Sequence, residues 1–185
     1  MPEGDQIDNS RLGFSYWLLV VFGFGVVGLT AAATTGEDWV TNATIALDNA
    51  ITTEWCDGQE RAMSKTWCSN YRTFEALQTT AVVLSGVGMV FLLTACCMPR
   101  PQTVECFSGV IFVLHAAAQA SAIGLLTILK DSFDDEVFSE NIFERGDTSL
   151  DDDLFYGTTF WVAIAAMAGG LIEGIDLCLI ARSKS

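Results

Sequence analysis

The sequence has little positive charge. Nine lysines and arginines stand against 23 aspartates and glutamates, which gives a formal net charge of −14 over 185 residues. A surface of this sign repels nucleic acid and anionic lipid headgroups, and it concentrates cations. We therefore expect no nucleic-acid partner.

Charged residues are nearly absent from four long apolar runs, at 12–33, 74–98, 106–129 and 155–180. Each run reaches the ~20 residues needed to cross a ~30 Å hydrocarbon core, which excludes a single soluble domain and predicts a lipid bilayer as partner. The first run is long enough to remain in the membrane, so we expect a signal-anchor and no cleaved signal peptide. The polar segments complete the predicted organisation as tail 1–11, loop 1 at 34–73, turn 99–105, loop 2 at 130–154 and tail 181–185.

Motifs for catalysis and metal binding are missing. His115 is the only histidine, and the sequence contains no Glu-x-x-His, no Cys-x-x-Cys and no EF-hand spacing. A Ser-His-Asp site stays open, although His115 has no placed partner. The sequence predicts a protein that is not an enzyme, with no cofactor, no bound metal and no small-molecule substrate.

Polar residues inside the runs are functional candidates because they are costly in a membrane. They are His115, with Gln119 one turn further on, and the pair Glu173 and Asp176. We expect His115 to bond a neighbouring helix. We expect the two carboxylates to face the cytoplasmic headgroup region near Arg182.

The cysteines predict the orientation. Cys56 and Cys68 lie in loop 1, where a disulfide would persist only in an oxidising compartment, and the glycosylation sequon at Asn42 lies in the same loop. Both termini of a plasma-membrane protein are therefore expected in the cytoplasm. The remaining cysteines fall at the opposite membrane face; they are Cys96, Cys97, Cys106 and Cys178.

Loop 1 is predicted to form a small β-sheet. Residues 39–45 and part of 51–55 alternate apolar and polar side chains, as strands do, and Cys56 and Cys68 bracket an Asp57-Gly58 turn pair. A hairpin closed by a disulfide is predicted, with two unpaired surface cysteines as the alternative. The fold class is all-α membrane: a four-transmembrane-helix bundle with a disulfide-stapled extracellular β-sheet.

Two acidic clusters in loop 2 are predicted to attract cations without a dedicated calcium site. A merely solvated surface is the alternative. The clusters are Asp134, Asp135 and Glu136, followed by Asp151, Asp152 and Asp153.

Cys96 and Cys97 lie beside the membrane and are candidates for S-palmitoylation. Buried, inert cysteines are the alternative.

Small residues recur at four-residue spacing in the third and fourth runs. Residues four apart share a helix face, and small faces let membrane helices approach closely. We expect both rows to pack inside the bundle. The rows are Ala116, Ala120 and Gly124, and Ala166, Gly170 and Gly174.

Trp39, Trp55, Cys56 and Cys68 resemble the W…GLW…C…C signature of the claudin, epithelial membrane protein and peripheral myelin protein superfamily, which includes gamma-type channel auxiliary subunits. Residues 68–87, CSNYRTFEALQTTAVVLSGV, resemble the family's entry into its second span. Gly-Leu does not precede Trp55, which adjoins Cys56, and residues 181–185 lack the hydrophobic terminus that many claudins present to PDZ scaffolds. The chain is therefore identified as a divergent member.

The resemblance implies a left-handed bundle topped by a sheet, with loop 2 adding a strand or a short helical extension. It implies action through the extracellular loops at cell–cell contacts, as adhesion, a paracellular barrier or a cation-selective path, with self-association in the membrane. The alternative is an auxiliary subunit that binds laterally to a larger ion channel or receptor and modulates its gating or trafficking. A third class is membrane organisation, as in myelin-type members.

Overall fold

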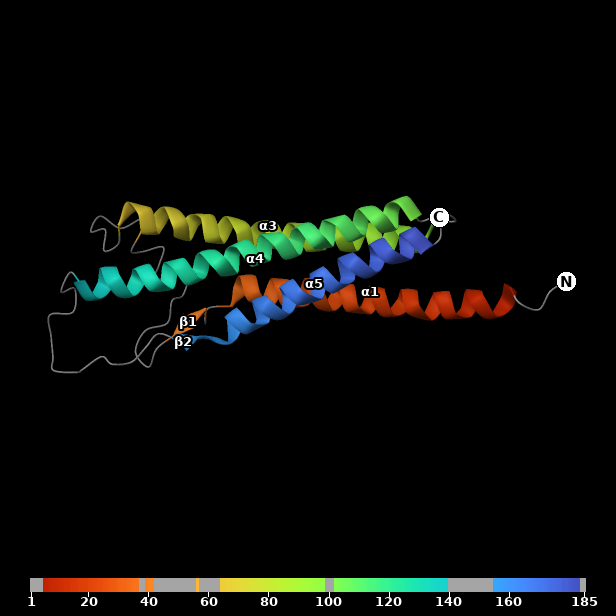
Figure 1. Ribbon diagram of the computed structural model, residues 1–185, viewed down its shortest axis with the longest axis horizontal. Coiled ribbons are helices and arrows are strands. Elements are labelled where there is room, and N and C mark those ends of the chain that lie inside the picture. The colour runs from red at the N-terminus through yellow and green to blue at the C-terminus, as the bar shows by residue number, and fades with distance from the viewer. Residues whose placement is uncertain are drawn as a thin grey trace.

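The computed structural model describes residues 5–36, 39–41, 56, 64–98, 102–139 and 155–183. Figure 1 shows four helices of these ranges side by side in one elongated bundle. The end of the bundle where α1 begins is also where α3 ends, α4 begins and α5 ends. In chain order the elements are α1 (Asp5–Thr35), β1 (Val40–Thr41), α3 (Lys65–Cys96), α4 (Gln102–Ser139), β2 (Phe155–Tyr156) and α5 (Thr158–Ser183).

All four helices are long and apolar enough to cross a membrane, over Tyr16–Thr35, Lys65–Cys96, Gln102–Ser132 and Thr158–Ser183. These ranges overlap the four predicted runs. Large apolar side chains are exposed on every helix, and an apolar outer surface of this extent suits lipid better than water. Examples are Phe24 on α1, Val90 on α3, Leu114 on α4 and Trp161 on α5. The chain is a multi-pass membrane protein.

Each helix extends past at least one end of its predicted span. α1 begins at Asp5, α3 begins at Lys65, and α4 continues to Ser139. A helix satisfies its own backbone hydrogen bonds inside and outside the bilayer, so it need not end at the membrane surface. As a result, Cys68 lies in the first turn of α3, and residues 134–136 lie on the last turns of α4 instead of in a loop.

A short strand pair joins loop 1 to the segment just before α5. Phe155 and Tyr156 were predicted as the start of the fourth span, but they form β2, and α5 begins only at Thr158. β1 and β2 are antiparallel, with Val40 opposite Tyr156 and Thr41 opposite Phe155. The Gly157 amide also donates to the Trp39 carbonyl at 3.1 Å. The segment after α1 is thereby tied to the start of α5. Residues 42–55, which carry the rest of the predicted sheet, lie outside the described residues.

α4 and α5 approach each other closely where two glycines meet. A Cβ placed on Gly174 would lie 2.7 Å from the Gly109 carbonyl oxygen, and one placed on Gly109 would lie 2.8 Å from the Gly174 carbonyl oxygen. Side chains at either position would force the backbones apart. Gly170 and Ala166 also face α4, so the small-residue row of the fourth run packs as predicted.

The corresponding prediction for the third run is wrong. Ala116 is buried, but Ala120 and Gly124 are exposed, and nothing lies within 4 Å of a Cβ placed on Gly124. Small residues are tolerated on a lipid-facing surface, so their spacing alone does not identify the packed face. The face of α4 that meets α5 carries Gly109 instead.

Replacing Gly174 with alanine tests this contact. We expect Gly174→Ala to destabilise the protein by about 1–3 kcal/mol, the usual cost of overpacking, and to lower the melting temperature in mild detergent. Gly124→Ala is the matched control because its added methyl group meets open space. Equal melting temperatures for the two variants would contradict the close approach of α4 and α5.

Candidate functional site

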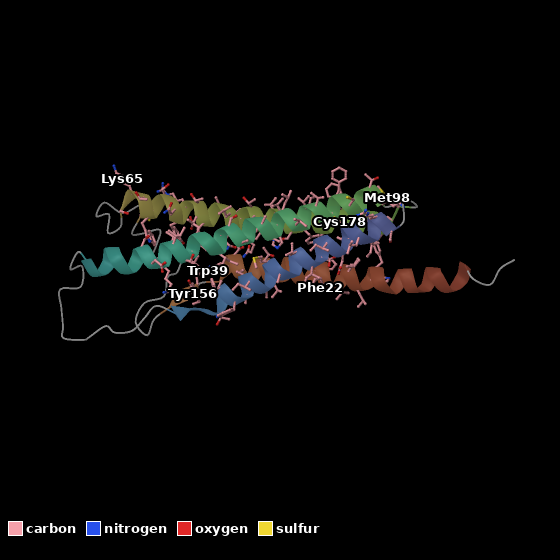
Figure 2. The ribbon with its side chains drawn as sticks, viewed as in Figure 1. Phe22, Trp39, Lys65, Met98, Tyr156 and Cys178 are labelled. Atoms are coloured by element: carbon pink, nitrogen blue, oxygen red, sulfur yellow. A yellow bond between two sulfur atoms is a disulfide. The ribbon has the colours of Figure 1, made fainter. Side chains whose placement is uncertain are left out.

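The bundle has two chemically different ends. We call the end that carries the Cys56–Cys68 bond the disulfide end, and the end that carries Cys96, Cys97, Cys106 and Cys178 the thiol end. Figure 2 shows Lys65 and Met98 at opposite ends of α3, with Cys178 close to Met98, and Trp39 and Tyr156 toward the other end. The disulfide predicted from the sequence is confirmed.

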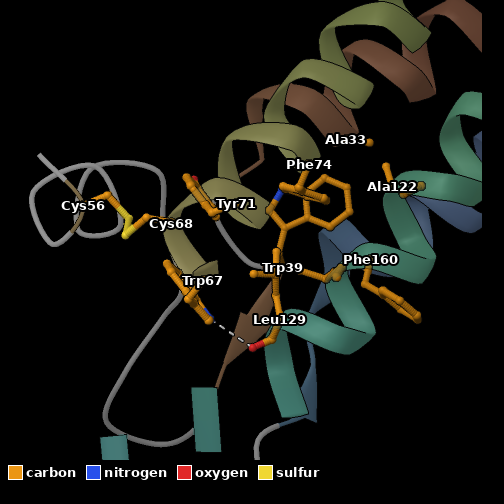
Figure 3. Close-up of a cluster of buried hydrophobic side chains, with 12 residues drawn as sticks. Ala33, Trp39, Cys56, Trp67, Cys68, Tyr71, Phe74, Ala122, Leu129 and Phe160 are labelled. Carbon is orange, nitrogen blue, oxygen red and sulfur yellow. Dashed lines mark hydrogen bonds between the residues drawn. A yellow bond between two sulfur atoms is a disulfide. The ribbon is translucent and has the colours of Figure 1, made fainter. Parts of the chain in front are cut away.

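Trp39 anchors the start of loop 1 at the disulfide end. Its side chain is 3% exposed and meets the Phe74 ring of α3 edge-on, with ring centroids 5.0 Å apart. Figure 3 shows Trp39 among Ala33, Phe74, Ala122 and Phe160, which come from all four helices. The segment that leaves α1 is therefore fixed in the core of the bundle.

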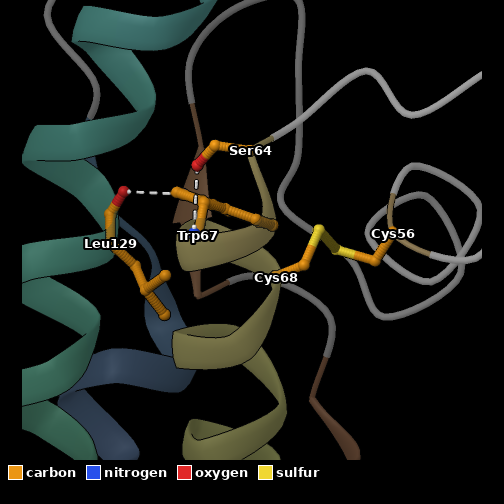
Figure 4. The surroundings of a disulfide bond; sticks show 5 residues. All are labelled: Cys56, Ser64, Trp67, Cys68 and Leu129. Atoms are coloured by element: carbon orange, nitrogen blue, oxygen red, sulfur yellow. Dashed lines mark hydrogen bonds between the residues drawn. A yellow bond between two sulfur atoms is a disulfide. The ribbon is translucent and has the colours of Figure 1, made fainter.

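Trp67 joins α3 to α4 in the same cluster. Its indole Nε1 donates to the Leu129 carbonyl at 3.2 Å, and its ring stacks on Tyr71 with centroids 5.6 Å apart. The Ser64 hydroxyl accepts from the Trp67 amide at 3.1 Å and so caps α3. The disulfide attaches Cys56 of loop 1 to Cys68 in the first turn of α3 (Figure 4).

Tyr156 connects the segment before α5 to the same cluster. Its ring stacks on Phe160 with centroids 4.0 Å apart. The Lys130 ammonium lies 5.7 Å from the centre of the Tyr156 ring, within the range of a cation–π interaction. Both polar segments of the disulfide end are therefore tied to one aromatic platform, built around Trp39, Trp67, Tyr71, Phe74, Tyr156 and Phe160.

The structure describes only some of the predicted site residues. Cys96 and Cys97 are exposed at the thiol end, so the alternative of buried, inert cysteines is wrong for this pair, and palmitoylation stays a prediction. The side chains of Asp134, Asp135 and Glu136 are not described. Asn42, Trp55, Asp151, Asp152 and Asp153 lie outside the described residues.

Inside the bundle, His115 contacts the three other helices. Its Nδ1 lies 3.1 Å from the Ala81 carbonyl oxygen of α3, and its Nε2 lies 3.4 Å from the Ala166 carbonyl oxygen of α5 and 3.5 Å from the Thr30 hydroxyl of α1. A carbonyl oxygen only accepts, so the shorter contact assigns a proton to Nδ1. The prediction that His115 bonds a neighbouring helix is confirmed.

Glu173 does not face the headgroup region as predicted. It is fully buried inside the bundle, and no described residue hydrogen-bonds to either of its oxygens. Asp176, one turn further, is exposed. The prediction treated the two carboxylates as one surface pair, but residues three apart on α5 diverge enough for one to face the interior and the other the outside.

Several buried polar residues were not predicted, and two of them have long side chains. Glu105 was assigned to the turn 99–105, but it is buried in α4, and Gln78 is buried in α3 with 3% of its surface exposed. Glu105, Ser108, His115 and Gln119 are spaced by three, seven and four residues, which places them on one helix face, and this spacing is a sequence signal that would have revealed a shared polar face.

A membrane-spanning four-helix bundle with a polar interior and an aromatic, disulfide-bonded end is the class that this fold and site define. No protein-family model matches the chain, and no curated protein matches it in sequence.

Removing the disulfide should weaken the disulfide end. The bond closes a loop of 12 residues, and its loss should cost roughly 2–3 kcal/mol in the chain-entropy model. We expect Cys56→Ser to be retained in the secretory pathway, measured by surface biotinylation of transfected cells. Cys97→Ser removes an exposed thiol at the other end and is the control. Normal surface expression of Cys56→Ser would contradict a structural role for the bond.

Proposed function

We propose that the chain is a claudin-like, four-span plasma-membrane protein that acts through its extracellular loops at cell–cell contacts. The contacts would provide adhesion and a paracellular barrier or a cation-selective path. The observation that carries this proposal is the aromatic platform, because it holds the bases of both long polar segments in one place.

Three contacts at the disulfide end support a recognition role. Trp39 fixes the start of loop 1, the Cys56–Cys68 bond fixes its end, and the β1–β2 pair brings Phe155 and Tyr156, which follow loop 2, beside them. A binding surface made of loops gains affinity when its loops are held in place before binding. The geometry therefore suits two segments that act together as a single surface.

The chemistry of the two ends supports the proposed orientation. A stable disulfide forms in an oxidising compartment, which favours an extracellular disulfide end. Free thiols are maintained in the cytosol, which favours a cytoplasmic thiol end. With this orientation α1 begins and α5 ends on the cytoplasmic side.

Cell aggregation tests the proposed function. The full-length protein, expressed in cells that lack adhesive junctions, should increase the fraction of cells in clusters. Mixing labelled expressing cells with unlabelled non-expressing cells then separates pairing between copies from binding to another protein. Aggregation at the level of untransfected cells, despite normal surface expression, would contradict the proposal.

A lateral groove favours the auxiliary-subunit alternative. Between α1 and α5 near the thiol end lies a lipid-facing groove of about 500 Å³. Most of its lining is apolar, with Asp176 as its acidic group, and this shape suits a helix of another membrane protein. The lining residues are Leu18, Leu19, Phe22, Ile172, Asp176, Leu179 and Ile180.

Purification in mild detergent separates the two candidates. A stoichiometric channel or receptor that is lost when Phe22 and Ile172 are changed to tryptophan would favour the auxiliary role. A series of self-oligomers without a larger partner would favour the contact role.

The acidic cluster of residues 151–153 should contribute to cation selectivity. Changing Asp151, Asp152 and Asp153 to asparagine should lower the cation preference of an expressing epithelial layer, because a cation-attracting charge is lost. Dilution potentials measure this preference. Changing Asp5 and Asp8 to asparagine at the thiol end is the control. An unchanged preference in the triple variant would show that the cluster is only a solvated surface.

A further inference from the structure

The buried face of α4 is polar over much of its length. Side chains on this face recur every three or four residues, and those from Glu105 to Gln119 are fully buried. Glu105 and Gln119 lie about 21 Å apart along the helix at ~1.5 Å per residue, which is about two-thirds of a ~30 Å hydrocarbon core. In order from the thiol end they are Glu105, Ser108, Phe112, His115 and Gln119.

Gln78 extends this polar path toward the disulfide end. The contact of His115 with the Ala81 carbonyl fixes how α3 lies beside α4, and Gln78 and Gln119 each lie about one turn beyond it. No described residue hydrogen-bonds to either carboxamide. Gln78 also lines a cleft of about 120 Å³ that reaches the surface, together with Thr34, Trp39, Phe74, Glu75 and Thr79.

Glu173 places a carboxyl group in the path on the thiol side of His115. Its Oε1 lies 3.6 Å from the position of a Cβ on Gly23, so the group reaches across from α5 to α1. Closer to the thiol end, Glu105 is buried in α4 with Tyr16 of α1 beside it. Two buried carboxyl groups therefore lie in the half of the bundle that is nearer the thiol end.

Apolar side chains close the path between His115 and Glu173. Phe112 is fully buried there, with Val26 from α1 and Met89 from α3 packed in the same cluster. Thr30, beside His115, and Gly23, beside Glu173, are about 10 Å apart along α1 at ~1.5 Å per residue. The imidazole and the carboxyl group thus lie on opposite sides of a short constriction.

We propose that the interior of the bundle conducts protons along this path, with Phe112 as its constriction. A proton that enters at the Glu75 cleft binds a ring nitrogen of His115, passes the constriction to a carboxyl oxygen of Glu173, and leaves past Glu105 at the thiol end. The reverse direction uses the same groups. Each transfer moves one proton and one positive charge, and no other reactant is consumed. The role does not depend on the cell-contact function.

A packing role accounts for His115 better than for Glu173. His115 and Ser108 contact backbone carbonyls of neighbouring helices, with Ser108 donating to Gly88 at 2.8 Å, and such contacts hold membrane helices together. Glu173 makes no such bond to any described residue. An ionisable residue placed this way inside a membrane protein is costly, and proton relays are a principal use of such residues.

Proton flux into liposomes tests the proposal. The purified full-length protein is reconstituted with a pH-sensitive dye inside, and a potassium gradient with valinomycin supplies the driving potential and the counter-ion. We expect acidification of the lumen well above that of protein-free liposomes. Flux at the protein-free level would overturn the proposal, as would a current that requires sodium and leaves the internal pH unchanged.

Three variants distinguish conduction from packing. Glu173→Gln keeps the shape of the side chain and should lower the flux at least tenfold, while Asp176→Asn, exposed on the same helix, should keep it. Phe112→Ala should raise the flux because it widens the constriction. Gel-filtration profiles establish that each variant is folded, and if Glu173→Gln is not, Phe112→Ala decides alone. Wild-type flux in a folded Glu173→Gln, or in Phe112→Ala, would overturn the proposed path.

Discussion

His115 touches α1, α3 and α5 from its position on α4, and these contacts place the polar face of α4 at the centre of the bundle. The rest of the arrangement depends on that placement. A bilayer gives apolar side chains no reason to gather inside, so polar contacts and close packing have to hold the helices together. The apolar side chains then face outward, as the exposed Val90, Leu114 and Trp161 show.

The disulfide end is held by different forces. Aromatic rings fill the space between the helices, and the Trp67 indole supplies a hydrogen bond from α3 to α4. Burial of a tryptophan removes a large apolar area from water while its N–H still finds a partner. The disulfide adds a covalent tie between loop 1 and α3, where a small extramembrane structure has little core of its own. The attachment of loop 1 and the packing of the bundle are therefore coupled at this end.

The sequence predicted the four spans because charge is excluded from hydrocarbon so strongly that its absence over about 20 residues is diagnostic. It also predicted the disulfide, since Cys56 and Cys68 lie in the same polar segment. The inward direction of Glu173 could not be predicted in the same way. Apart from Asp176, its neighbours on α5 are apolar or glycine, so no periodic contrast separates the lipid-facing side from the buried one. The prediction that Ala120 and Gly124 pack inside the bundle was wrong for a related reason, because small residues suit lipid-facing surfaces and helix interfaces alike.

The central claim is that Glu173 and the polar face of α4 lie inside the bundle. Measuring the register between α4 and α5 tests this claim most directly, because the register sets the position of Glu173 and the direction in which the polar face points. Cys106 and Cys178 are in contact across this interface, and a Cβ placed on Gly109 would lie 2.8 Å from the Cys178 sulfur. Oxidation of native membranes that carry Cys96→Ser and Cys97→Ser should join Cys106 to Cys178, as detected by mass spectrometry of the linked peptides. If both thiols remain unlinked yet react fully with maleimide after denaturation, other faces of α4 and α5 meet, and the polar interior described here is contradicted.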